Sequence, residues 1–207
     1  MVSLYELKPR FQSLLRPLVG ALSAMGVTAN AVTLTTMLMS CGVSAILLAA
    51  SSHEWFLLLP LWMFLRMALN AMDGMLAREF KQESALGAYL NELADVVSDA
   101  ALLLPFIAVQ PFGWASVGSV IFLAGLSEMT GAIGPMVGAP RCYAGPMGKS
   151  DRALVFGGLG LWFGLAGNLP AWAFWLMPVV SGLIIVNIVN RIRGGLKHAA
   201  PGHLNSP

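Results

Sequence analysis

Charged residues are scarce in this chain of 207 residues. Asp, Glu, Lys and Arg together make up 11% of the sequence, whereas apolar residues make up 57%, and the mean hydropathy is +0.74. Because charged residues form roughly a quarter of a soluble globular domain, this composition excludes an ordinary soluble protein. The net charge of +2 is also too small to indicate a nucleic-acid partner. We therefore expect a polytopic integral membrane protein.

Cysteine and histidine are also rare. Cys41 falls inside an apolar stretch and Cys142 in a predicted loop, so the two cysteines provide no disulfide framework and no metal-ligand spacing. The three histidines, His53, His198 and His203, lie in predicted loops or the tail and far apart. They do not indicate a metal site.

The sequence contains six long apolar stretches. They cover residues 32–51, 55–77, 86–109, 114–138, 153–167 and 172–190. Most are long enough for a helix that crosses a hydrocarbon core of roughly 30 Å. The fifth is the weakest because glycines dilute it, although glycine is common where membrane helices pack closely. The predicted fold is therefore all-α, with six transmembrane helices.

The positions of lysine and arginine predict the orientation in the membrane. Eleven of the twelve lie in four clusters, before the first stretch, between the second and third, between the fourth and fifth, and after the sixth. Because these residues favour cytoplasmic loops, both termini are predicted to be cytoplasmic. The twelfth, Arg66, lies inside the second stretch.

The first 25 residues have the pattern of an amphipathic helix that lies on the membrane surface. Apolar residues recur at helical spacing among charged ones, at Leu7, Phe11, Leu14, Leu15, Leu18 and Leu22. Pro17 is expected to kink this helix or to mark its break. We predict a single domain over residues 1–200, with residues 1–25 as this amphipathic leader, followed by a short tail over 201–207.

Polar residues form two regular series inside the apolar stretches. The first series has offsets of four and three, and the second repeats every four residues, so each lies on one face of its helix. The first is Arg66, Asn70 and Asp73, and the second is Gly87, Asn91, Asp95 and Asp99. A short connection of about ten residues predicts antiparallel helices whose polar faces meet near the cytoplasmic surface.

Carboxylate and amide oxygens of this kind suit a hard cation, Mg²⁺ or Mn²⁺, and through it an anionic substrate such as a diphosphate. The predicted metal ligands are Asn70, Asp73, Asn91 and Asp95, with Asp99 as a further candidate. Nearby, Gly74 and Ala77 leave room for a bulky group, and Arg78 is placed to contact phosphate. The structural alternative is a buried ion pair between Arg66 and Asp73 or Asp99, with the asparagines as interhelical hydrogen-bonding groups.

The same residues resemble the signature of the CDP-alcohol phosphatidyltransferase family, D-x-x-D-G-x-x-A-R, eight residues, then G-x-x-x-D-x-x-x-D. Here the segments are NAMDGMLAR, EFKQESAL and GAYLNELAD. The matching residues are Asp73, Gly74, Ala77, Arg78, Gly87 and Asp95. VTANAVT, residues 27–33, is similar to the family's T-P-N-x-x-T segment, with Ala29 in place of proline.

This resemblance implies an enzyme of phospholipid biosynthesis in the cytoplasmic membrane of a bacterium. A divalent metal holds the diphosphate of a CDP-alcohol, of which CDP-diacylglycerol is the commonest, an acceptor hydroxyl attacks, and CMP leaves. The family's last aspartate, the base that activates the acceptor, corresponds to Asp95. The implied CDP-binding residues are Asn30, Thr33, Asp73, Gly74, Ala77, Arg78 and Gly87. The resemblance also implies a homodimer.

Two positions depart from the family pattern. Asn70 and Asn91 stand where the family has its first and third aspartates, so the motif carries two negative charges instead of four. Asparagine coordinates through its carbonyl oxygen without contributing charge, so we expect weaker metal binding at a site for either one metal or two. Asp99 or Glu92 is the candidate to compensate. The alternatives are a catalytically weakened subunit that binds lipid or CDP, and an ion transporter.

A second candidate region is RCYAGPMGKSDR, residues 141–152. Its glycines and Lys149, with Arg152 and with Arg191 after the sixth stretch, are predicted to bind the phosphate of a lipid or acceptor. The alternatives are an ordinary positively charged cytoplasmic loop and, for Arg191, contact with lipid headgroups. Glu128 is expected either to pair with Arg66 or to line the cavity.

Overall fold

The protein is described by a computed structural model covering residues 4–142 and 145–198, in which we find helices and no strand. The long helices are α1 Leu4–Ala24, α2 Ala29–Ala49, α3 Leu58–Glu79, α4 Ala85–Leu103, α5 Trp114–Ile133, α6 Lys149–Ala166 and α7 Leu176–His198. Short 3₁₀ helices are η1 His53–Leu57, η2 Leu104–Ala108, η3 Gly134–Val137 and η4 Ala171–Trp175. The all-α prediction is confirmed. The predicted tail, 201–207, lies outside the described residues, and so do the side chains of residues 4–10.

Four helical segments are long and apolar enough to cross a membrane. They are Ala29–Ala49, His53–Glu79, Trp114–Val137 and Ala171–His198. The protein is therefore an integral membrane protein. Helices α4 and α6 do not reach the length and hydropathy of these four segments. Helix α4 carries the second polar series, and α6 is short and begins with charged residues. The six-span count therefore stays a prediction.

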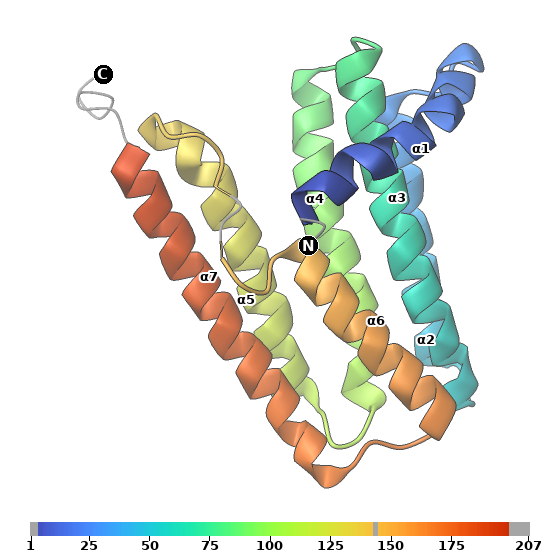
Figure 1. Cartoon of the computed structure of the whole chain (residues 1–207). Coiled ribbons are helices and arrows are strands. Elements are labelled where there is room, and N and C mark those ends of the chain that lie inside the picture. The colour runs from blue at the N-terminus through green and yellow to red at the C-terminus, as the bar shows by residue number, and fades with distance from the viewer. Residues whose placement is uncertain (1–3, 143–144, 199–207) are drawn as a thin grey trace.

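The long helices form two groups that α6 lies between (Figure 1). Helix α2 packs against both α3 and α4, α5 packs against α7, and α6 packs against α3 and η1. Helix α6 begins deep within the bundle, well below the level at which α4 starts and α3 and α7 end (Figure 1). The connection from α5 to α6 therefore descends between the helices and brings the first residues of α6 into the interior.

Helix α1 runs obliquely along the side of the bundle, in front of α4 and α3 in Figure 1, and packs on α3. The Phe11 ring meets the edge of Phe64 at a centroid distance of 6.5 Å, and the Arg16 guanidinium makes two 3.1 Å hydrogen bonds to the Glu79 carboxylate. Helix α1 continues through Pro17 without a break in its helical assignment. Gly26, with φ +79°, then makes the left-handed turn that leads into α2.

The apolar core fills the half of the bundle where η1 and η2 lie. Phe106 is fully buried there and contacts Phe56 and Phe156 at centroid distances of 5.6 and 5.5 Å. Nearby, the Trp62 indole N–H donates to the Ser40 hydroxyl at 3.0 Å. A second, smaller apolar cluster joins α1, α2 and α3 in the opposite half of the bundle, next to the polar residues, around Val19, Val32 and Leu76.

Candidate functional site

The two polar series face each other across a gap between α3 and α4. Because α2 packs against both helices, they have little direct backbone contact, and long side chains span the space between them. The Asn70 amide donates to Asp95 Oδ1 at 3.2 Å, and Arg66 Nη1 donates to Asp99 Oδ1 at 2.5 Å. The predicted meeting of the two polar faces is confirmed, with α2 holding the helices apart.

Two adjoining cavities open in this half of the molecule. The larger has a volume of about 680 Å³ and lies among α3, α4, α5, α6 and α7. The smaller has a volume of about 340 Å³ and lies where α2 and α4 begin and α3 ends. Residues that line both are Asp73, Gly74, Arg78 and Asn91. The two cavities therefore share a wall formed by residues of the signature segments on α3 and α4.

The cavities collect most of the predicted site residues. Asn70, Asp73, Asn91 and Asp95, the four principal metal-ligand candidates, line the larger one. The residues expected to bind CDP, Asn30, Thr33, Asp73, Gly74, Ala77, Arg78 and Gly87, line the smaller one. Of the predicted phosphate ligands, Lys149 and Arg191 line the larger cavity and Arg152 does not.

Asp73 is held in place by a residue 40 positions earlier in the chain. The Thr33 hydroxyl donates to Asp73 Oδ2 at 2.7 Å and also lies 3.1 Å from the Ala29 carbonyl oxygen. Asp73 is only 5% exposed. The Thr28 hydroxyl caps α2 by accepting from the Ala31 N–H at 3.2 Å, so the first turn of α2 sets the position of Thr33. Thr33 therefore orients a carboxylate as well as lining the smaller cavity.

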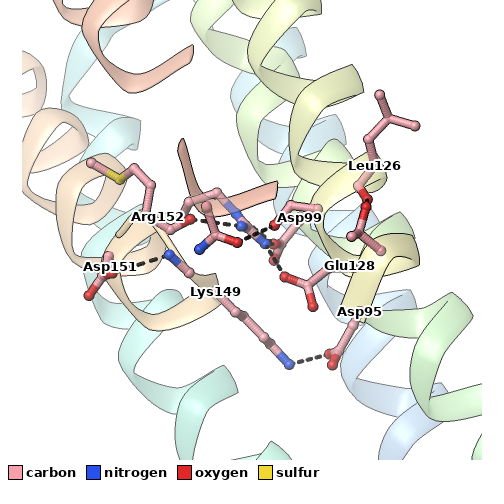
Figure 2. A network of polar contacts seen from close by, with 12 residues as sticks. Asp95, Asp99, Leu126, Glu128, Lys149, Asp151 and Arg152 are labelled. Atoms are coloured by element: carbon pink, nitrogen blue, oxygen red, sulfur yellow. Dashed lines mark hydrogen bonds and ion pairs between the residues drawn. The ribbon is translucent and has the colours of Figure 1, made fainter. Parts of the chain in front are cut away.

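Asp95 receives several donors on one carboxylate oxygen. In addition to the Asn70 amide, the Lys149 ammonium contacts Oδ1, and Arg66 Nη2 lies 3.5 Å from it (Figure 2 shows the lysine contact). Arg66 Nη2 also donates to the Asp95 carbonyl oxygen at 3.2 Å. These contacts fix the carboxylate at the wall of the larger cavity.

Asp99, one turn deeper, belongs to a buried ion-pair network. Its two oxygens bind Arg66 at 2.5 Å and Arg152 Nη2 at 2.7 Å, and Arg152 continues to Glu128 Oε1 at 3.0 Å (Figure 2). Asp99 and Arg152 do not line either cavity. Because a buried carboxylate needs a partner of opposite charge, we interpret this network as support for the site. The position of Asp99 outside both cavities does not support its predicted role as a metal ligand. The position of Arg152 likewise does not support its predicted role as a phosphate ligand.

Glu128 joins α5 to α6 and α7. It binds Arg152, lies 3.4 Å from Arg191 Nη1 and 3.9 Å from Arg141 Nη2, and lines the larger cavity. Of the two expectations for Glu128, lining the cavity is confirmed and pairing with Arg66 is wrong, because Arg66 pairs with Asp95 and Asp99 on the facing helix.

Asn187 of α7 is fully buried and was not among the residues predicted from the sequence. Its amide donates to the Pro146 carbonyl oxygen at 2.8 Å, and its carbonyl accepts from the Ser127 hydroxyl at 2.9 Å. Asn187 therefore ties the segment before α6 to α5 and α7. The available signal was an asparagine inside the last apolar stretch, which by itself does not reveal its partner.

Glycines let the segment before α6 approach the helices closely. A Cβ on Gly131 of α5 would lie 2.8 Å from the Cys142 carbonyl oxygen, and one on Gly145, which has φ +126°, would lie 2.9 Å from the Asn187 Cα. Gly148 then starts α6, where its N–H donates to Asp151 at 3.1 Å. The glycines of this region thus position Lys149 against α4.

The described residues include no group of three or more His, Cys, Asp or Glu side chains placed to hold a metal ion. Asn70 and Asn91 contribute amide oxygens instead of carboxylates. A metal held here would therefore rely on two carboxylates, Asp73 and Asp95, together with amide oxygens. The predicted ligand set stays a prediction.

The fold and the cavities define an integral membrane protein with a charged site between its helices. The model of the CDP-alcohol phosphatidyltransferase family matches residues 26–186, and the chain belongs to this family. It is therefore an enzyme of phosphatidyl transfer in phospholipid synthesis, as the signature residues implied.

Individual proteins are similar to this chain in sequence or in fold. The chain is 44% identical over 202 residues to inner membrane protein YnbA of Escherichia coli, covering 96% of this chain and 99% of that protein. Two solved structures of phosphatidylinositol phosphate synthase from Mycobacterium tuberculosis have the same fold at 18% identity. The one with manganese and citrate has a TM-score of 0.71 and covers 92% of each chain. The one with CDP-DAG bound has a TM-score of 0.73 and covers 92% of this chain and 96% of that chain.

Proposed function

We propose that the protein transfers the phosphatidyl group of CDP-diacylglycerol to a hydroxyl acceptor and releases CMP, with Mg²⁺ or Mn²⁺ as cofactor. The observation that carries this proposal is the arrangement of the two cavities. The expected nucleotide-binding residues line one, the expected metal ligands line the other, and Asp73 belongs to both. The structurally similar synthase that binds CDP-DAG, and its form with manganese, support the choice of donor and metal.

The donor set fits one hard divalent cation. Asp73 and Asp95 supply carboxylate oxygens, and Asn70 and Asn91 supply amide oxygens, all on the wall of one cavity. When bound, the metal neutralises phosphate charge and polarises the phosphoryl group. With two carboxylates in this set, we propose one metal per chain and a lower affinity than a site of four aspartates would have.

The residues around this set have complementary roles. Asp95 accepts the proton of the acceptor hydroxyl. The oxygen of that hydroxyl forms a bond to the phosphorus of the phosphatidyl group, and the bond between this phosphorus and the oxygen of CMP breaks. Arg78 folds over Gly74, where a Cβ would lie 2.9 Å from its Nη2, and borders both cavities. This position suits a contact with the diphosphate of the nucleotide, while Thr33 orients Asp73.

Positive side chains on the far wall of the larger cavity suit a second phosphate. Lys149 and Arg191 both line this wall, and Arg191 is only 3% exposed. Its Nε has no hydrogen-bond partner among the residues that the structure describes. We propose that these two residues bind the phosphate of a lipid or acceptor, with Arg152 supporting them from behind through Glu128.

We further propose six membrane crossings, in which α4 and α6 join the four helical segments that are long and apolar enough to cross a membrane. Asp95 and Asp99 of α4 pair with Lys149 and Arg152 of α6, which lowers the cost of placing these four charges in the membrane. The basic clusters then place both termini in the cytoplasm, and the E. coli relative supports the bacterial inner membrane. We propose that the protein is a homodimer, as the family resemblance implies.

The test uses the purified full chain in detergent with radiolabelled CDP-diacylglycerol, Mg²⁺ or Mn²⁺, and a panel of polyol and amino-alcohol acceptors. We expect metal-dependent CMP release that identifies the acceptor. The matched Asp95→Asn variant keeps the side-chain shape and should release CMP at least about a hundredfold more slowly. Metal-dependent CDP binding without release would indicate a weakened subunit, and absence of both would favour a transporter.

A further inference from the structure

Lys149 stands at a position that local electrostatics disfavours. It is the first residue of α6, where the unpaired N–H groups of the helix already create positive potential. Asp151 caps this end by accepting from the Gly148 N–H, which satisfies a backbone donor and not the lysine. The compensating charge for the Lys149 ammonium comes from α4, because the ammonium contacts Asp95 Oδ1. The ion pair with Asp95, 54 positions away in the sequence, thus stabilises the Lys149 ammonium at a helix N-terminus that disfavours positive charge.

The Asp95 carboxylate depends less on its ion pair with Lys149 than the more buried Asp99 carboxylate depends on its ion pairs with two arginines. Asp99 is bound by two arginines inside the protein, whereas Asp95 stands at the cavity wall, with its side chain 19% exposed and that of Lys149 28% exposed. Both members of the Asp95–Lys149 pair line the larger cavity. The ammonium can therefore leave Asp95 without leaving a charge sealed in an apolar interior.

We propose that Lys149 is a resident counter-cation of Asp95 that competes with the divalent metal and is drawn away by an anionic substrate. Lys149 is then a positioning residue in the metal-dependent transfer proposed above, on which this role rests. An ammonium and a divalent cation that share one carboxylate repel each other, so the metal binds weakly while Lys149 stays on Asp95. A phosphate in the cavity attracts the ammonium, frees Asp95, and strengthens metal binding. Metal and anion therefore bind cooperatively.

The test measures Mn²⁺ binding to the full chain in detergent by electron paramagnetic resonance, with no substrate present. Lys149→Met removes the charge and keeps much of the chain length, and we expect it to lower the Mn²⁺ Kd about tenfold. The matched control is Lys197→Met, which removes an exposed lysine of α7 and should leave the Mn²⁺ Kd within about twofold of that of the unmodified protein. An unchanged or weaker Kd for Lys149→Met, in protein with an unaltered circular dichroism spectrum, overturns the proposal.

Two further measurements separate this role from a structural one. Sulfate, a phosphate mimic that binds Mn²⁺ weakly in solution, should tighten Mn²⁺ binding to the unmodified protein and have no such effect on Lys149→Met. In an Asp95→Asn background, Lys149→Met should no longer tighten Mn²⁺ binding, because the shared carboxylate is gone. Absence of the sulfate effect in the unmodified protein overturns the proposal even if Lys149→Met does not fold.

The outcomes distinguish this role from the proposed function. If the unmodified protein binds Mn²⁺ and releases CMP, but Lys149→Met leaves the Kd unchanged, the role of Lys149 is wrong and the transferase stands. If the unmodified protein neither binds Mn²⁺ nor releases CMP, both are wrong.

Discussion

Replacing Arg152 with methionine should destabilise the protein severely, because this side chain holds two buried carboxylates. The guanidinium binds Asp99 at 2.7 and 3.2 Å, Glu128 at 3.0 Å and the Met147 carbonyl oxygen at 3.0 Å, and its side chain is only 3% exposed. Removing one partner of such a network leaves charge buried without compensation and costs about 3–5 kcal/mol. Asp99 would retain Arg66, and Glu128 would retain its weaker contact with Arg191, so we expect the lower part of this range.

The assay is thermal unfolding of the purified protein in detergent, followed by circular dichroism. For a chain of this length, a loss of 3 kcal/mol corresponds to a fall in Tm of about 6–12 °C. Arg152→Lys keeps the charge but cannot bind both carboxylates in the same way. Its Tm should lie between the Tm of the unmodified protein and that of Arg152→Met. The matched control is Lys149→Met, which removes a charge at the cavity wall and should lower the Tm by much less. A Tm for Arg152→Met within 2 °C of the unmodified protein would refute the structural role.

The remaining predictions concern the smaller cavity and the surface. Thr33→Val removes the hydroxyl that holds Asp73 and keeps the side-chain shape. Mn²⁺ binding measured by electron paramagnetic resonance should therefore weaken by about threefold to tenfold while the Tm stays nearly constant. A fall in Tm with an unchanged Mn²⁺ Kd would contradict this. Gly87→Ala places a methyl group 2.8 Å from the side-chain oxygen Oδ1 of Asn30, and it should raise KM for CDP-diacylglycerol more than it lowers kcat; unchanged kinetics would show that the cavity does not hold the nucleotide. Arg16→Gln breaks an exposed ion pair and should leave the Tm and CMP release unchanged, with a clear fall in either one counting against this expectation.

The family signature was recognisable because its chemistry is local. Asp73, Gly74, Ala77 and Arg78 follow one another within two turns of a helix, so their spacing alone places them together. Hydropathy predicted the all-helical membrane fold for a similar reason, since a helix satisfies its own backbone hydrogen bonds within one continuous segment. The membrane-crossing status of α4 and α6 did not follow as clearly, because their polar residues lower the hydropathy on which such a prediction depends.

Partners of buried charges could not be predicted in the same way. Asp99 was a candidate metal ligand and Arg152 a candidate phosphate ligand, yet the structure pairs them with each other across 53 positions of sequence. Thr33 was expected to contact the nucleotide, and its hydrogen bond to Asp73 depends on how α2 packs beside α3. Residue type indicates that such a side chain needs a partner, but helix packing determines which partner it meets.

The sequence by itself determined the membrane class, the helical elements and the two polar faces, because hydropathy and helical periodicity act over a few neighbouring residues. Only the tertiary structure decided how these faces are used. The segment before α6 descends into the bundle and brings Lys149 to Asp95 and Arg152 to Asp99, whereas α2 keeps α3 and α4 apart and leaves space for the cavities. The physical reason is that a charge in a membrane protein is stabilised by whichever opposite charge lies near it in space, and the depth at which each helix begins sets that distance.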